Sequence, residues 1–294
     1  MPPDYAVCAL AARDTVRIIA ARTTALAREG QRRHDCSPTV TAALGRLLTA
    51  AVLMSISLKR RERITLQIDA DGPVGGLIAD ALPDGRVRGY PRRPRAELPL
   101  NSDGKFDVGG IVGRGTLHVT RLFENGQPYT SAVRLATGEI GDDLAAYFAR
   151  SEQTPSVVAV GVLADRQGVV ASGGLLAQLL PGAGEDAVDA LEKAAGAFPQ
   201  ISTLVREGLS PEEIVLRFAG SLSPRMTHVQ PVSFRCTCDR ARVARALIGL
   251  GREQLADMAA SQHDTEATCE FCAQRFYFSA AEIASILEDA SAAV

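Results

Sequence analysis

The sequence predicts an α+β protein: an N-terminal mixed sheet/helix core domain, a helical linker and a small C-terminal zinc-binding α+β module. Three observations lead to this prediction. Short strand-type segments with turn residues between them run from Ile64 to Leu180, helical patterns interrupt them without regular alternation, and four of the six cysteines lie near the C-terminus. Strands and helices that do not alternate are typical of α+β folds rather than doubly wound sheets. We expect boundaries at residues 1–182, 183–231 and 232–294.

Composition indicates a globular protein with little attraction for nucleic acid or membranes. Of the 294 residues, 46% are apolar and 22% charged, which is enough for a core without disulfides. The net charge of −2 disfavours electrostatic binding to nucleic acid or anionic lipid, and the absence of Trp leaves few side chains for stacking on bases. No secretory signal is recognisable before Leu26. We therefore expect a cytoplasmic protein whose thiols are normally reduced.

The most apolar stretch, Val40–Leu58, is predicted to be a buried core helix. Arg46 lies near its middle, where a membrane span would tolerate it poorly. Ser37 followed by Pro38 is a typical helix start.

The middle of the chain is predicted to form strands and hairpins. The expected elements are strand Ile64–Asp69, a hairpin of Gly76–Asp80 with Arg86–Tyr90, a hairpin of Thr116–Thr120 with Tyr129–Val133 around Asn125-Gly126, helix Glu139–Arg150, and strand-like Val157–Leu163 and Gly168–Leu180.

A helical linker follows the turn Pro181–Gly184. We expect one amphipathic helix or two short ones after it, and a further helix that begins at Ser210 with a capping box. Ser221–Pro231 is predicted to be a connection. The linker has enough apolar residues to dock on a neighbour but few for its own core, so it should be marginally stable.

The last unit, from Phe234 onward, is predicted to be a small cysteine-containing module. Helices are expected over Arg240–Leu250 and Arg252–Ala260, a strand over Cys269–Phe278, and a final helix from the capping box at Ser279. So small a module has little room for an independent core, and a metal ion would help to stabilise it.

Two close cysteine pairs point to a zinc site. Cys236 and Cys238 flank one Thr, and Cys269 and Cys272 flank two residues, a pattern that fits tetrahedral thiolate coordination of zinc. His263 is the one nearby alternative ligand. The simplest interpretation is a structural staple.

The one-residue gap at Thr237 favours a redox-sensitive site instead. It is shorter than the usual spacing of two to four, and a disulfide across it would be constrained and easily reduced. Oxidation of either pair removes two ligands, and the roughly 10–16 kcal/mol of metal binding energy exceeds the ~5–15 kcal/mol stability of a typical domain. The module should then unfold and loosen whatever is docked through it.

Two other classes of function stay open. A zinc-stapled nucleic-acid binder is the main alternative, although the 239–268 interval is longer than in the usual zinc ribbon. A thiol oxidoreductase is third, because a thioredoxin-like Cys269-x-x-Cys272 should open a helix, whereas Ala273–Phe278 continues as strand. No Gly-x-Ser-x-Gly elbow, phosphate loop or His-rich metal pattern is found, so we predict that the protein is not an enzyme.

The chain closely resembles the bacterial redox-regulated heat-shock chaperones of about thirty-three kilodaltons, the zinc-switch holdase family. The Cys-x-Cys and Cys-x-x-Cys pairs at this interval are the family's signature, and the mass of 31.1 kDa fits. The other matching segments are Gly76–Asp80, Val87–Tyr90, Gly138–Leu144, Tyr147–Pro155, Gly173–Leu175 and Gln178–Ala183.

This resemblance implies an ATP-independent holdase, inactive while Cys236, Cys238, Cys269 and Cys272 hold one zinc ion. Oxidants are expected to form disulfides Cys236–Cys238 and Cys269–Cys272, releasing zinc and unfolding the module and linker. The exposed surface would then hold unfolding client proteins, and the active form would be a homodimer through its N-terminal domain.

Apolar residues of the linker are the candidate client-binding surface, unless they serve only for docking. They are Val188, Leu191, Ile201, Leu204, Ile214, Val215 and Phe218. Cys8 and Cys36 lie outside the signature and are expected to be incidental. A basic stretch is interpreted as a solvated hairpin edge rather than a nucleic-acid contact; it comprises Arg86, Arg88, Arg92, Arg93 and Arg95.

Overall fold

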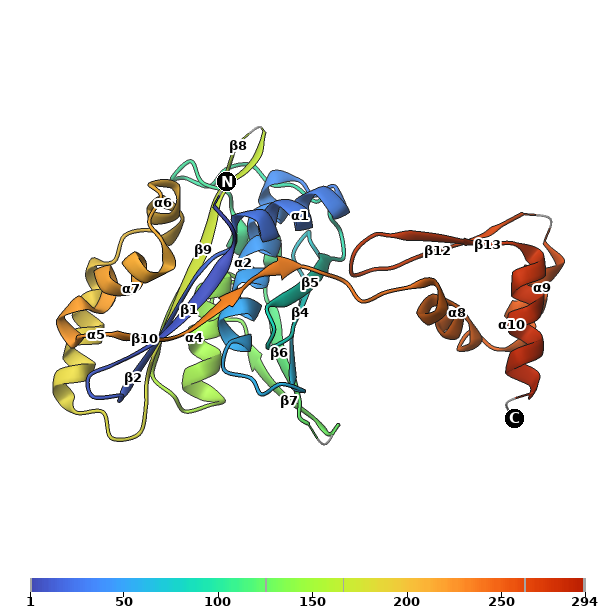
Figure 1. Cartoon of the computed structure of the whole chain (residues 1–294). Helices are drawn as coiled ribbons and strands as arrows, with labels where there is room; N and C mark the ends of the chain where they lie inside the picture. The colour runs from blue at the N-terminus through green and yellow to red at the C-terminus, as the bar shows by residue number, and fades with distance from the viewer. Residues whose placement is uncertain (1, 125, 166, 262, 293–294) are drawn as a thin grey trace. The chain divides into compact units, whose positions relative to one another are not determined.

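The computed structural model describes all residues except 1, 125, 166, 262 and 293–294 (Figure 1). The chain divides into two compact units, Met1–Arg235, here the core unit, and Cys236–Val294, here the cysteine unit. Both contain sheet and helix, so the predicted α+β class is confirmed.

The core unit contains two sheets and seven α-helices among its described residues. In chain order its elements are β1 (Tyr5–Ala11), β2 (Val16–Arg22), α1 (Thr24–His34), α2 (Pro38–Ser55), β3 (Arg63–Ala70), β4 (Leu77–Ala81), β5 (Arg86–Pro91), α3 (Val108–Val112), β6 (Gly115–Leu122), β7 (Pro128–Arg134), α4 (Ile140–Arg150), β8 (Ser156–Asp165), β9 (Gly168–Leu179), α5 (Glu185–Ala197), α6 (Ile201–Arg206), α7 (Pro211–Ala219), a 3-10 turn (Gly220–Leu222), β10 (Arg225–Pro231) and β11 (Ser233–Phe234).

One sheet has five antiparallel strands in the order β10-β1-β2-β9-β8, and the other has six in the order β11-β5-β4-β3-β6-β7. In the second sheet only β11 is parallel to its neighbour, β5. Both predicted hairpins are confirmed by strand pairing; Asn125 of the second lies outside the described residues.

Helix α2 is the core helix that the sequence predicts. It packs against strands of both sheets, and 89% of its residues are buried. The Ser37 hydroxyl accepts a hydrogen bond from the Val40 N–H, which caps the helix before Pro38. Arg46 forms an ion pair with Glu139, which explains how a charge is accommodated here. Although α2 is long and apolar enough to cross a membrane, in this fold it is an internal helix.

Helices α5, α6 and α7 lie against the five-stranded sheet (Figure 1). Of the two arrangements predicted after the turn, one amphipathic helix or two short ones, the structure has two helices, α5 and α6, and the predicted Ser210 capping box is present. Their apolar side chains join those of β1, β2 and β9 in one buried cluster that includes Val7, Ile18 and Leu175.

The predicted connection over Ser221–Pro231 is wrong, because residues 225–231 form β10, an edge strand paired with β1. Its partner strand lies more than 200 residues earlier in the chain, so no local sequence pattern predicts β10. Phe234 also belongs to the core unit, since β11 pairs with β5 and the guanidinium of Arg33 lies 5.2 Å from the Phe234 ring centre.

The cysteine unit has a small core of its own. Its elements are α8 (Arg240–Ile248), α9 (Arg252–Ala260), β12 (Thr265–Thr268), β13 (Arg275–Phe278) and α10 (Ala280–Ala292). The two helices between the cysteine pairs are as predicted, whereas the predicted strand Cys269–Phe278 begins only at Arg275. Strands β12 and β13 pair antiparallel. Five buried apolar residues form the core, namely Leu247, Leu255, Phe276, Phe278 and Ile283.

Candidate metal centre

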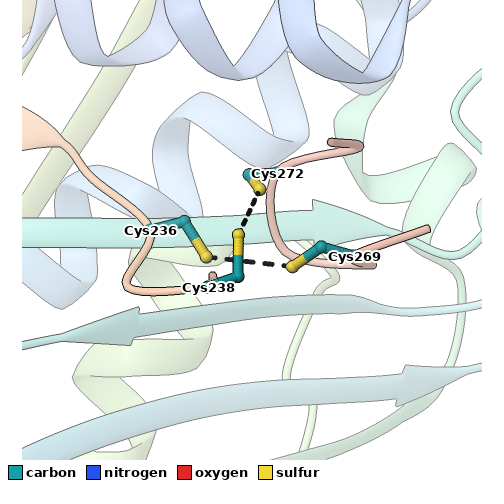
Figure 2. Close-up of side chains that lie close together, drawn as sticks. All are labelled: Cys236, Cys238, Cys269 and Cys272. Carbon is teal, nitrogen blue, oxygen red and sulfur yellow. Dashed lines mark hydrogen bonds between the residues drawn. The ribbon is translucent and has the colours of Figure 1, made fainter. Parts of the chain in front are cut away.

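The four predicted cysteines come together in the cysteine unit, and their side chains point toward one another (Figure 2). Cys236 and Cys238 lie on the loop before α8, while Cys269 and Cys272 lie on the turn between β12 and β13. All four sulfurs lie within 4.8 Å of one another. Among the described residues no histidine or carboxylate, His263 included, joins this group.

The turn that carries Cys269 and Cys272 is fixed by its own backbone. The N–H groups of Cys272 and Ala273 both donate to the Cys269 carbonyl, at 3.3 and 2.7 Å, and the Cys269 N–H donates to the Gln274 carbonyl at 2.9 Å. Ala273 adopts a left-handed conformation with φ of 55°, which turns the chain into β13. Both thiols therefore face the same side without a helix behind them, unlike a thioredoxin-type motif.

The loop that carries Cys236 and Cys238 is tied to the start of α8. Asp239 caps the helix by accepting from the Arg242 N–H at 2.7 Å, and Arg242 donates to the carbonyl and hydroxyl of Thr237 at 3.2 and 2.7 Å. Thr237 thus does more than separate the two cysteines. Neither this role of Arg242 nor the 3.9 Å contact of Gln274 with Cys238 was predicted from the sequence.

The sulfur spacing fits a tetrahedral metal site. With metal–sulfur bonds of about 2.3 Å, the sulfurs of a tetrahedral thiolate site lie about 3.8 Å apart. Cys236 and Cys269 have sulfurs 3.8 Å apart, and those of Cys238 and Cys272 are 3.3 Å apart. Four thiols at these distances could hold one metal ion.

Two of the four thiols, Cys238 and Cys269, lie in surroundings that favour the protonated form. Burial, followed by hydrogen bonding to Cys272, raises the pKa of Cys238. Burial and the charge of Cys236 raise the pKa of Cys269. Because metal binding requires thiolates, a bound cation must supply the charge compensation that these surroundings lack.

The other predicted site residues lie in the core unit. Of the seven linker residues, all but Val188 are buried, and those six belong to the cluster on the five-stranded sheet. Cys36 is buried, which raises the pKa of its thiol to about 12, and Cys8 is half-buried on β1. Four arginines of the basic stretch form ion pairs with aspartates; they are Arg86, Arg88, Arg92 and Arg95.

Comparison with known proteins places this arrangement in a family. A family model described as Hsp33 protein matches residues 4–279, a range that takes in most of both units and all four cysteines. The chain belongs to the Hsp33 family.

Individual relatives agree with the Hsp33 assignment over the full length. A 33 kDa chaperonin of Desulforamulus reducens is 41% identical over 286 residues, covering 97% of both chains. One of Geobacillus kaustophilus is 43% identical over 282 residues, covering 95% of this chain and 96% of that protein. The crystal structure of the 33 kDa chaperonin of Thermotoga maritima matches with a TM-score of 0.90 at 33% identity, covering 99% of both chains. The resemblance inferred from the sequence motifs is confirmed.

Proposed function

We propose that this member of a chaperone family is a redox-regulated, ATP-independent holdase that binds unfolding proteins when its cysteine cluster is oxidised. The observation that carries the proposal is the cluster itself: four thiols within 4.8 Å in a unit that has only five buried apolar residues in its described core. A unit this small depends on a cross-link for stability, so chemistry at the thiols changes its fold.

Cys236, Cys238, Cys269 and Cys272 would hold one zinc ion in the reduced protein. Zinc fits the all-sulfur ligand set, and it would supply a redox-inert cross-link between the loop before α8 and the turn before β13.

Oxidation acts on the thiolates in pairs. Each pair forms one sulfur–sulfur bond and transfers two electrons to the oxidant; with hydrogen peroxide the O–O bond breaks, and two protons complete two water molecules. We propose the pairs Cys236–Cys238 and Cys269–Cys272, because each pair lies on one loop and can close without the other. Once both disulfides form, no thiolate ligand remains and nothing connects the two loops.

Unfolding of the cysteine unit would loosen the helical segment 185–219 of the core unit. Six of its seven candidate client-binding residues are buried against β1, β2 and β9, so its release would expose apolar surface on both the helices and the sheet. In the proposed organisation, residues 1–182 form the core and dimerisation domain, 183–231 the linker, and 232–294 the switch. The oxidised form is proposed to be a homodimer in the cytoplasm.

The test compares reduced and peroxide-treated protein with a Cys8→Ser/Cys36→Ser variant as control, because that variant keeps only the four clustered thiols. In both proteins, peroxide should release the metal, measured with a chromogenic chelator. It should at the same time lower the light scattering of a heat-denatured client without nucleotide. Retained metal with salt-dependent nucleic-acid binding would favour the zinc-stapled nucleic-acid binder instead.

Peptide mapping of the oxidised protein tests the disulfide pairs. The shortest sulfur–sulfur distances, 3.8 and 3.3 Å, join one cysteine of each loop to one of the other, namely Cys236 to Cys269 and Cys238 to Cys272. Disulfides between the loops would keep the unit closed, and finding them would refute unfolding by local disulfide formation.

A further inference from the structure

An open cavity of about 710 Å³ lies in the core unit. Its walls come from the segment after α2, the β4–β5 turn and the edge strand β10. The lining residues are Ile56, Leu58, Arg60, Pro83, Asp84, Arg86, His228 and Gln230. Its volume is in the range of small-molecule sites, which is roughly 300–1,000 Å³.

The lining of the cavity carries a net positive charge, because Asp84 and Arg86 form an ion pair with each other and Arg60 is left over. Asp84 is the one acid in the lining, and its carboxylate already accepts hydrogen bonds from the side chain of Arg86, at 2.8 Å, and from its backbone N–H, at 3.3 Å. Gln230 donates to the Asp84 carbonyl at 2.9 Å, which fixes the turn against β10. Within the described part of the chain, the side chains of Arg60 and His228 have no hydrogen bond or ion pair, although the backbone of His228 pairs with β1.

One wall is apolar. Ile56 and Leu58 are half-buried and pack against the main core cluster, and Pro83 extends this wall at the turn. A ligand for such a cavity needs an anionic group for the unpaired Arg60 and His228, and an uncharged body for the opposite surface.

We infer that this cavity binds an organic phosphate, with the phosphate at Arg60 and His228 and the apolar or aromatic body against Ile56, Leu58 and Pro83. An arginine side chain without a partner offers a planar set of N–H donors that suits phosphate oxygens.

Binding here would also stabilise β10, since two of the lining residues, His228 and Gln230, belong to that strand. Strand β10 is the part of the chain between the helical segment 185–219 and the cysteine unit. A ligand that binds only while β10 is paired with β1 opposes its detachment by mass action. This step, unlike the rest of the inference, rests on the proposed function. There the ligand would delay activation by oxidation.

Calorimetric titration with adenosine monophosphate, inorganic phosphate and adenosine tests the site. The first probe carries both the phosphate and an uncharged aromatic part, the second only the phosphate, and the third only the uncharged part. Adenosine monophosphate should bind most tightly, inorganic phosphate more weakly, and adenosine at least about tenfold more weakly than the monophosphate. Adenosine that binds as well as its monophosphate would overturn the assignment of the anionic group.

Arg60→Ser and Arg61→Ser form a matched pair, because both arginines are exposed neighbours but only Arg60 lines the cavity. Arg60→Ser should weaken binding of the monophosphate about tenfold, as expected for one charge-assisted hydrogen bond. Arg61→Ser should change the dissociation constant less than twofold. Equal affinities in the two variants would refute the site.

Hydrogen exchange of Met226–Gln230 gives a readout that is independent of chaperone activity. Saturating monophosphate should slow exchange in this part of β10 in the wild type but not in Arg60→Ser. Binding that leaves these amides unchanged would refute the link to β10, whether or not the protein holds unfolded clients.

Discussion

The two units of this protein bury their apolar residues on very different scales. The core unit has two large clusters, one around α2 between the sheets and one beneath α5–α7, whereas the buried apolar cluster in the described part of the cysteine unit has five residues. Burial of apolar surface stabilises by about 25 cal/mol per Å² against the entropy of ordering the chain. The first unit can therefore fold on hydrophobic burial, whereas we expect the second to depend on a cross-link through its thiols.

The first and largest predicted effect is loss of the metal site. The double variant Cys269→Ser/Cys272→Ser removes two ligands and should take away most of roughly 10–16 kcal/mol of metal-coupled folding free energy. Hydrogen exchange should show residues 236–292 unprotected while α2 and the two sheets keep their protection.

Cys8→Ser/Cys36→Ser is the control for this variant, since both thiols lie in the core unit outside the cluster. It should leave exchange in the cysteine unit unchanged. Persistent protection of β12 and β13 in the Cys269→Ser/Cys272→Ser protein would show that the five-residue core suffices, and the contrast between the units would fail.

The second prediction concerns Phe278, the largest fully buried side chain of the cysteine unit. Its ring also has the Arg240 guanidinium 4.4 Å from its centre. Phe278→Ala should cost about 3–5 kcal/mol. Because so little else is buried, metal should be released to a chelator faster than from wild type, whereas Tyr277→Ala, on the exposed side of the same strand, should leave the release rate unchanged.

The third prediction tests how α6 is seated on the five-stranded sheet. Gly161 of β8 and Gly173 of β9 are cross-strand partners. A Cβ on Gly161 would lie 2.9 Å from Cγ2 of Ile201 and 3.2 Å from the Ser202 nitrogen. Gly161→Ala should therefore lift α6 at a cost of about 1–3 kcal/mol. Proteolysis within 185–219 should accelerate while metal is fully retained.

Gly196→Ala is the matched control in the same segment. Gly196 lies in α5 and an added Cβ would meet nothing within 4 Å, so this change should raise helix propensity by about 1 kcal/mol and slow proteolysis. If the reduced Gly161→Ala protein has a loosened segment but does not suppress client aggregation, exposure of these helices is not sufficient for the proposed activity.

Local signals explain which parts of this fold could be predicted from the sequence. The Ser37 cap with Pro38, the turns of both hairpins and the four cysteines each lie within a few residues of what they determine. The apolar spacing of the linker likewise identified side chains that are in fact buried, such as Leu204 and Ile214.

Non-local pairing explains what was missed. Strands β1 and β2 were not predicted, because the turn between them uses Ala12, Arg13 and Asp14 in left-handed conformations, with φ of 49°, 55° and 67°, instead of the usual Gly or Asn. Alternation in β2 is hidden because both its faces are covered, one by each large cluster. Strand β10 is defined by its pairing with β1, which no local pattern encodes.

The smallest predicted effect concerns the serine capping box, a motif that is present in both units. Ser210 caps α7 and Ser279 precedes α10; each accepts a hydrogen bond from the backbone N–H of the glutamate three residues later, Glu213 or Glu282, at 3.2 and 3.3 Å. Each glutamate accepts in return from the serine N–H, which lowers its pKa. A carboxylate whose pKa is lowered by folding stabilises the folded state at pH values above its usual pKa of 4.5. This stabilisation is lost as the pH falls through the lowered pKa.

Ser210→Ala and Ser279→Ala should each remove about 1 kcal/mol of capping free energy. In the core unit this is a small part of the total, so thermal unfolding should shift by a few degrees without a change in metal affinity. In the cysteine unit the same loss falls on a fold whose apolar core is minimal, and chelator-induced unfolding should accelerate about fivefold. Equal effects of the two substitutions on metal release would mean that the capping of α10 is not coupled to the thiol cluster.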